Sequence, residues 1–572
     1  MMKSVLVCLF LFFPIKIIGD LPVHCLKHQI VGNWSFHISS VLKEGDSREQ
    51  CGHESPDNPK TSNKPNFELI QKKIIALTLN SDDSVYLATS QILNSNNKWT
   101  MIYDEGFDVF FDNIHYFSFS DFLNKNNHDY SRCGRTLIGW WFNEKTLEKG
   151  CFRGEKEGDN QILTENSDQT SVVQPKFLEK IKLKTKYLFK KEENLNKLFK
   201  ARKSKRFILK EKVNQKFIEE KKQFPLLNLI TSLNQHVNKS WTADLHPDFE
   251  SLSLKDLNKF AGRKKYASFN STEYDQYKTI RYSFLQKVST KKEDNELHKA
   301  KPSNFAENEI NDRSSNALNA DIENKPNSNF ELPKNFDWST YLQPPRSQGN
   351  CGSCYIFATL AMLQTRLKIK YEEELILSVQ NLINCNYYNQ GCDGGYPFLV
   401  GKYGHEFNLV EEKYDRYIGE NGKCLNIEKN NEESKNGKKS KVGNYYFIGG
   451  SYGRSNEQAM MEEIYKNGPI VASFEPKPDF MTYKKGIYHS IHETDWLKLG
   501  VKPEWEKVDH SVLCYGWGEE NGEKFWLLQN TWGSNWGEKG NFRMIRGVDE
   551  SHIESIAEAA DTYIIYENKE VN

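Results

Sequence analysis

The sequence predicts an α+β protein of several units, and three observations support this prediction. A chain of 572 residues is too long for one compact core. Its cysteines fall into two groups, because none lies between Cys151 and Cys351. The first group lies among alternating aromatic and β-branched residues, whereas helical and strand patterns are mixed around the second. We therefore expect an antiparallel β unit, a middle segment without disulfides and a mixed helix-and-strand unit.

The chain begins with a pattern typical of a secretory signal peptide. Lys3 precedes an apolar run over residues 5–13, and the small Gly19 follows. This run is shorter than the roughly 20 residues needed to cross a bilayer, so a membrane anchor is the weaker alternative. We expect residues 1–19 to be removed and the mature chain to be made in an oxidising compartment, where disulfides form. Candidate glycosylation triplets of that route begin at Asn33, Asn238 and Asn270.

Residues 20–156 carry strand signals. The stretches WTMIYDEGFDVFF, IHYFSFSDF and TLIGWWF are aromatic, β-branched and roughly alternating. Such segments favour an antiparallel sheet that is closed or sandwiched. The unit holds four cysteines, which allow three disulfide connectivities: Cys25, Cys51, Cys133 and Cys151.

The middle of the chain, residues 157–331, has the composition of a removable segment. Residues 176–222 are helical in pattern and basic, with 18 Lys or Arg against 6 Asp or Glu. We expect a solvated amphipathic helix there, and a helix that binds a polyanion is the alternative. Residues 288–331 are polar and poor in large apolar side chains, which predicts a disordered, protease-accessible linker. The whole chain has 77 basic and 77 acidic side chains, so charge gives no argument for a nucleic-acid partner.

A new globular unit begins near residue 332 and contains the stretch QGNCGSCYIFATL, in which Cys351 and Cys354 are three positions apart. Such a pair can be a redox pair, half of a zinc site, or a reactive thiol beside a structural one. A zinc site needs a second Cys or His pair at ligand spacing, but Cys385 and Cys392 are separated by six residues, so we predict no metal site. Helical periodicity begins near Cys354, and a helix N-terminus lowers a thiol pKa and favours the thiolate.

Three distant residues fit a nucleophilic role for Cys354. His510 stands at the head of an apolar strand in VDHSVLCYGWG and can take the thiol proton. Asn530 lies in LLQNTWG and can orient the imidazole. Gln348 lies six residues before the thiol, and its side-chain amide can act with the backbone N–H of Cys354 on a developing oxyanion. A redox pair would leave these three residues without a role.

These stretches make residues 332–572 resemble the papain-like cysteine peptidases. Further shared stretches are NQGCDGGYPF, WLLQNTWGSNWGEKG and ESIAEAA. The stretches YKKGIYH, DLPVHC, VGNWSF and GWWF are similar to the branch of that family that releases dipeptides. The resemblance implies a two-lobed peptidase domain, with a helical lobe and a β-barrel-like lobe. It also implies an antiparallel β-barrel exclusion domain over residues 20–156 and a largely helical propeptide within residues 157–331.

The resemblance also implies roles for individual residues. It pairs Cys25 with Cys133, Cys51 with Cys151, Cys351 with Cys392, and Cys385 with Cys424, and it leaves Cys354 and Cys514 outside disulfides. Gly394, Gly395 and Trp532 are expected to bind substrate. Asp20, the first residue after the signal, is expected to receive the α-ammonium of the substrate. A carboxylate at that place fits the removal of dipeptides from free N-termini.

Expectations about ligands and partners follow from the same resemblance. We expect no required cofactor. Relatives bind chloride partly through tyrosine hydroxyls, but Phe398 and Phe447 occupy those positions, so chloride dependence is doubtful. The expected partners are peptides and proteins with free N-termini, with no nucleic acid and no stable membrane anchor, and the family implies a homotetramer. The expected location is the secretory route, ending in a lysosome-like compartment, in a vacuole or outside the cell.

Two other functions remain open at this point. One is a papain-like endopeptidase whose N-terminal domain regulates it. The other is a non-catalytic binding protein on a peptidase scaffold, which the four residues Gln348, Cys354, His510 and Asn530 argue against.

Overall fold

The structure, a computed structural model, describes residues 23, 25–42, 51, 71–89, 96–125, 128–158, 229–235, 240–249, 331–425, 427, 437–491 and 510–565. The expected signal segment, Asp20, the basic stretch 176–222 and all of the linker 288–331 except its last residue lie outside these residues. In the described part of the chain, every helix is too short or too polar to cross a bilayer.

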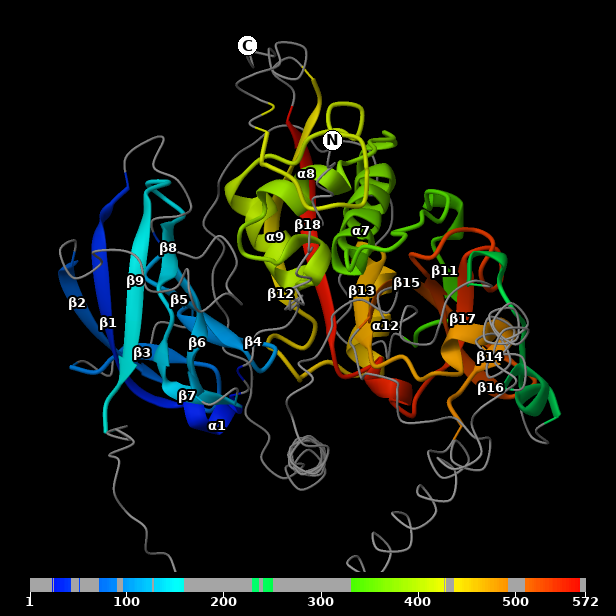
Figure 1. The fold of residues 1–572 in the computed structure, drawn as a ribbon, viewed down its shortest axis with the longest axis horizontal. Helices are drawn as coiled ribbons and strands as arrows, with labels where there is room; N and C mark the ends of the chain where they lie inside the picture. Colours follow the sequence, from blue (N-terminus) through cyan, green and yellow to red (C-terminus); the bar gives the residue numbers. More distant parts are fainter. Residues whose placement is uncertain are drawn as a thin grey trace, which may run out of the picture.

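The N-terminal unit is an antiparallel barrel, drawn from blue to cyan in Figure 1. Its strand order is β3-β2-β1-β9-β7-β6-β5-β4, and β8 joins by pairing with both β6 and β9. The elements are α1 (Lys27–Ile30), β1 (Gly32–Val41), β2 (Gln71–Leu79), β3 (Val85–Leu87), β4 (Lys98–Ile102), β5 (Gly106–Phe111), β6 (Ile114–Lys125), β7 (His128–Thr136), β8 (Gly139–Asn143) and β9 (Lys149–Lys156).

Side chains that alternate between the two faces of each strand form the core of this barrel on one face. On β1, Trp34, Phe36 and Ile38 are buried, because side chains two residues apart point to the same face of a strand. The ring of Trp34 packs 5.1 Å from that of Phe107, and the ring of Phe36 packs 5.0 Å from that of Phe152. The disulfides Cys25–Cys133 and Cys51–Cys151 close the unit, and they are the pairs that the family resemblance implied.

The C-terminal unit has a helical lobe and a sheet lobe. The helical lobe contains η3 (Ser339–Tyr341), α7 (Cys354–Tyr371), α8 (Val379–Cys385), η4 (Gly391–Asp393) and α9 (Pro397–Glu406). The disulfides Cys351–Cys392 and Cys385–Cys424 hold its loops, again as the resemblance implied. Helix α7 is buried along most of its length and packs against the second sheet.

The second sheet has the order β10-β14-β17-β16-β15-β13-β18-β12, with β11 added on β15. Its elements are β10 (Trp241–Ala243), β11 (Phe336–Asp337), β12 (Lys439–Phe447), α12 (Glu457–Asn467), β13 (Ile470–Phe474), η5 (Phe480–Thr482), β14 (Tyr483–Tyr488), β15 (His510–Glu520), β16 (Glu523–Gln529), β17 (Asn541–Ile545), η6 (Glu550–His552) and β18 (Ala557–Ile565). Strand β18 lies between β12 and β13, so it is covered along both edges.

Part of the middle segment is packed onto this sheet. Strand β10 pairs antiparallel with β14, and the indole N–H of Trp241 donates a 2.9 Å hydrogen bond to the carbonyl of His489. The helical turn over 229–235 and η2 (Pro247–Phe249) flank the strand. The described part of the expected propeptide is therefore helical only in part, because its strand extends the sheet of the C-terminal unit.

Buried charges join the two units. His115 on β6 lies between two carboxylates of the N-terminal unit, with Nδ1 2.9 Å from Asp108 and Nε2 3.0 Å from Glu144. From α9 of the C-terminal unit, Lys402 lies 3.8 Å from Asp108. His405, also on α9, lies 3.5 Å from Glu144. The contact between the units is thus a network of alternating charges.

Candidate active site

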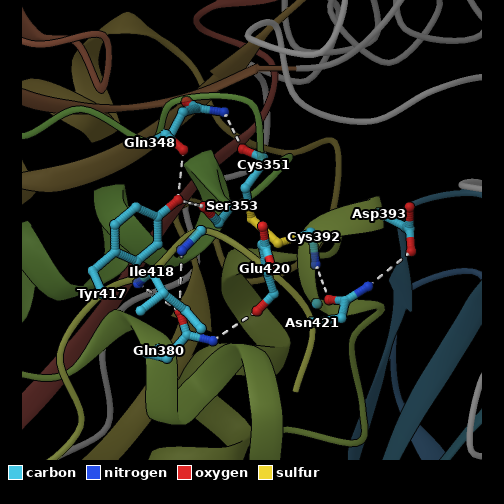
Figure 2. Close-up of a disulfide and its surroundings, with 12 residues drawn as sticks. Gln348, Cys351, Ser353, Gln380, Cys392, Asp393, Tyr417, Ile418, Glu420 and Asn421 are labelled. Carbon is cyan, nitrogen blue, oxygen red and sulfur yellow. Dashed lines mark hydrogen bonds between the residues drawn. A yellow bond between two sulfur atoms is a disulfide. The ribbon is translucent and has the colours of Figure 1, made fainter.

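The candidate nucleophile stands where a loop becomes a helix. Helix α7 begins at Cys354, as the sequence predicts, and Ser353 precedes it as the N-cap residue. The disulfide Cys351–Cys392 fixes the loop just before this helix (Figure 2), and Cys354 is in none of the four disulfides. A thiol at this place lies next to the positive end of the helix dipole, which favours its ionised form.

The candidate base is oriented by an amide. Strand β15 begins at His510, and the Nε2 of this ring lies 2.7 Å from Oδ1 of Asn530. The same Oδ1 accepts the backbone N–H of Thr531 at 2.8 Å, which fixes the orientation of the amide. Since Oδ1 can only accept, Nε2 carries the proton, and Nδ1 has no hydrogen-bond partner among the described residues. Nδ1 is therefore the nitrogen that can take a proton from a thiol.

Aromatic rings enclose this imidazole. The ring of Trp532 stacks on His510 with centroids 4.8 Å apart and planes 28° apart, and Phe474 meets its edge at 5.8 Å. His510 is fully buried, and this burial lowers its pKa to about 4, although the hydrogen bond to Asn530 acts in the opposite direction. The imidazole is consequently neutral over the physiological range, which is the form required of a base.

Gln348 is held rigidly beside the nucleophile loop. Its Nε2 donates to the carbonyl of Cys351 at 2.9 Å, and its backbone carbonyl accepts from the hydroxyl of Tyr417 (Figure 2). Its Oε1 accepts from the hydroxyl of Thr531. The sequence predicts that this amide faces an oxyanion. One hydrogen of Nε2 is engaged by Cys351, so only the second hydrogen is available for that role.

A small cavity contains the predicted substrate residues. Cys354 lines it together with Gly394, Gly395, Ser511 and, from the N-terminal unit, Tyr103. At Gly395 a Cβ would lie 2.6 Å from the side chain of Asn389 and 2.7 Å from the ring of Tyr355, so a larger residue would clash with both side chains. Trp532 lies instead behind the base, where it stacks on His510.

The packed middle segment covers the same region from the other side. The ring of Phe249 in η2 meets Trp532 at 5.9 Å, and His246 packs on Trp536 at 5.8 Å. Nε2 of His246 also bonds the carbonyl of Tyr483 at 2.8 Å. The middle segment therefore packs on the aromatic residues behind the candidate base.

The residues at the expected chloride site do not fit an anion. The rings of Phe398 and Phe447 stack at 4.7 Å with planes 12° apart, and neither has a hydroxyl to donate. Phe447 pairs across the sheet with Glu558, whose carboxyl takes the backbone N–H of Phe398. The two rings therefore offer an anion no side-chain hydrogen bond.

The sequence analysis did not identify Tyr103, which lines the cavity, or Glu558, which contacts Tyr103. Tyr103 follows β4 with a positive φ of 51°, and its ring packs on Tyr396 and Tyr452 of the other unit at 4.9 Å and 5.2 Å. Its hydroxyl donates to Glu558 at 3.1 Å. The stretch YDEG signals a turn, but nothing local signals where that turn docks. Asp20, the expected amine receptor, lies outside the described residues.

Two families of known proteins match different parts of the chain. Residues 332–560 match the family described as papain family cysteine protease, and residues 20–156 match the cathepsin C exclusion domain. Cathepsin C of Schistosoma mansoni is 28% identical over 552 residues, covering 94% of this chain and 94% of that protein. Dipeptidyl aminopeptidase 1 of Plasmodium falciparum (isolate 3D7) is 30% identical over 305 residues, or 39% of this chain and 44% of that protein. Pro-cathepsin H of Bos taurus is 33% identical over 223 residues, or 38% of this chain and 60% of that protein.

Proposed function

The chain belongs to the papain family of cysteine peptidases and carries a cathepsin C exclusion domain, and we propose that it removes dipeptides from free N-termini. It is a hydrolase of the cysteine type, with peptides as substrates. The observation that carries the proposal is Tyr103, a residue of the exclusion domain that lines the cavity of the nucleophile. A domain that forms part of this wall limits how much substrate lies on the amino side of the cut.

Cys354 is the nucleophile in this proposal and His510 is its base. Nδ1 of the imidazole takes the thiol proton, and the thiolate attacks the carbonyl carbon of the second substrate residue. The resulting imidazolium gives its proton to the leaving amine, which departs as the new N-terminus. Water then hydrolyses the thioester and regenerates the thiol. Asn530 keeps the ring oriented through both half-reactions.

The oxyanion is stabilised by two donors, the second hydrogen of Gln348 Nε2 and the backbone N–H of Cys354. The contacts of Gln348 to Cys351, Thr531 and Tyr417 hold the amide in place before substrate arrives. Loss of one such preorganised donor typically costs about 2.7–4 kcal/mol of transition-state stabilisation.

Asp20 is proposed to bind the α-ammonium of the substrate. The match to the exclusion domain begins at this residue, and removal of the expected signal would make it the N-terminal residue. A charge pair near 4 Å contributes roughly 1–4 kcal/mol between bulk water and a partly buried site. This interaction would distinguish a dipeptidyl peptidase from an endopeptidase.

The four disulfides fit a protein of the secretory pathway. We further propose a lysosome-like, vacuolar or extracellular destination and assembly as a homotetramer. Residues 240–249 belong to an inhibitory propeptide in this proposal, which their packing on Trp532 and Trp536 beside the candidate base supports.

The deciding experiment is mass spectrometry of the products from one unblocked peptide. Successive losses of two residues are expected from the wild type, and none from Cys354→Ser. An N-acetylated copy of the peptide is the control, because acetylation removes the charge that Asp20 would bind. Internal fragments from the acetylated peptide would instead indicate an endopeptidase with a regulatory domain.

A further inference from the structure

One buried carboxyl beside the active-site cavity has no role in the chemistry described above. Glu558 lies on β18 and is 3% exposed. Its Oε1 accepts the hydroxyl of Tyr103 at 3.1 Å, and the backbone N–H of Phe398 also acts on the carboxyl, whereas Oε2 makes no hydrogen bond of regular geometry among the described residues. A buried carboxyl with one unused oxygen is costly to keep unless something else uses it.

Hydroxyl groups connect this carboxyl to the nucleophile cavity. The hydroxyl of Tyr103 also lies 3.2 Å from Oγ of Ser473, and Ser473 lies 2.9 Å from Oγ of Ser511. Tyr103 and Ser511 both line the cavity that contains Cys354. One wall of the cavity is therefore polar and leads to Glu558.

The surroundings of Glu558 contain no compensating cation. Its neighbours across the sheet are Phe447 on β12 and Val471 on β13, and the backbone N–H of Phe398 and the hydroxyl of Tyr103 are its donors. Burial raises its pKa to about 8, although those two hydrogen bonds act in the opposite direction. Among the described groups that act on this carboxyl, none carries a positive charge. A cationic group placed next to it would compensate for its burial.

The substrate residue that reaches this wall is the first one. When the carbonyl of the second residue lies at Cys354, the N-terminal residue lies one step, about 3.8 Å between Cα atoms, toward the exclusion domain. Tyr103 belongs to that domain. In the dipeptidyl mode of binding proposed above, the side chain of the N-terminal residue would face Tyr103 and Ser511, which line the cavity.

We propose that Glu558 forms the base of the pocket for the side chain of the substrate's N-terminal residue and selects lysine or arginine there. The proposal rests on the dipeptidyl aminopeptidase activity proposed above. The cationic group would occupy the position beside Oε2, and the three hydroxyls would hydrogen-bond its remaining donors.

The test compares two fluorogenic dipeptide amides, Lys-Ala and Met-Ala, whose N-terminal side chains are unbranched and similar in length. Both carry the same α-amine, so the ratio of their kcat/KM values cancels effects on folding, on the thiol and on the amine. In proteolytically activated Glu558→Gln we expect the Lys-to-Met ratio to fall at least tenfold near pH 7.5. The matched control is Asp561→Asn, which removes the same charge from an exposed position on the same strand.

A ratio that stays constant in Glu558→Gln would overturn the proposal. If that variant does not fold, the wild type alone provides a second test, because a carboxyl of raised pKa must ionise to bind a cation. The Lys-to-Met ratio should then rise between about pH 5.5 and pH 8, and a flat profile would contradict the assignment. If neither free dipeptide amide is cleaved but blocked peptides are, the dipeptidyl activity fails instead. The same Lys and Met comparison is then made two residues before the cut in blocked peptides, where an unchanged ratio would still refute the role of Glu558.

Discussion

Removal of the cation between Asp108 and Glu144 should loosen the contact between the exclusion domain and the peptidase domain. His115→Phe keeps a ring against Phe110, which packs 4.7 Å from the imidazole, but it deletes both N–H donors. Removing one partner of a buried ion pair typically costs 3–5 kcal/mol. Lys402 and His405 remain near the two carboxylates, so we expect about 2–3 kcal/mol, equivalent to a decrease of roughly 5–10 °C in Tm.

The pH dependence of this contact follows from the raised pKa of His115 and the lowered pKa of Glu144. Burial opposes the charged form of His115, but Asp108 and Glu144 outweigh it and raise the pKa of the ring. Its contribution to stability is complete below its ordinary value of 6.5 and is lost as pH rises through the raised pKa. Hydrogen bonds from His115 and His405 lower the pKa of Glu144, so its contribution is complete above 4.5 and is lost in stronger acid. The contact should therefore be firmest between pH 4.5 and pH 6.5.

The assay is calorimetric unfolding of the full chain, in a Cys354→Ser background that prevents self-digestion. The Tm difference between His115→Phe and its parent should be large near pH 5.5 and should shrink as pH rises through the raised pKa of His115. His28→Phe, at an exposed position on α1, is the matched control. A difference that does not change with pH would show that the ring acts by packing and not by charge.

Three further predictions concern the peptidase domain. Asn530→Ala should lower kcat about 10²-fold in a steady-state assay of the activated enzyme, since the imidazole loses its orienting acceptor, and an unchanged kcat would exclude that role. Activity should differ by less than about twofold between chloride-free buffer and physiological saline, because Phe398 and Phe447 offer an anion no hydroxyl. Arg366→Met should destabilise the domain by about 3–5 kcal/mol in urea titration, because it leaves Glu463 and three carbonyls without their buried donor, whereas Lys370→Met on the exposed face of α7 should not.

Local patterns predicted the parts of the fold that depend on local physics. The aromatic and β-branched stretches over residues 99–111 and 114–122 predicted strands, and β4, β5 and β6 form there. Helical periodicity near Cys354 predicted the start of α7, and the apolar run after His510 predicted β15. Each of these signals lies within a few residues of the feature that it predicts.

The wall of the cavity could not be predicted in this way, because it depends on contacts between distant segments. Tyr103 lies in a turn whose stretch YDEG has many possible neighbours, and its position is set by packing on Tyr396 and Tyr452. Glu558 lies in EAADTY, which has the composition of a solvent-exposed strand. Pairing with both β12 and β13 buries it instead.

Removal of strand β10 during processing would expose a new edge of the second sheet. Strand β10 is the edge strand of its sheet and pairs with β14. Excision of residues 240–249 would uncover a row of backbone donors and acceptors along Tyr483–Gly486, and bare edges of this kind invite other chains to add on. Two lysines, Lys484 and Lys485, stand on that margin, and lysine is a residue that natural sheets use to discourage such self-association. Removal of residues 240–249 would thus leave β14 as an edge strand whose two lysines disfavour pairing with another chain.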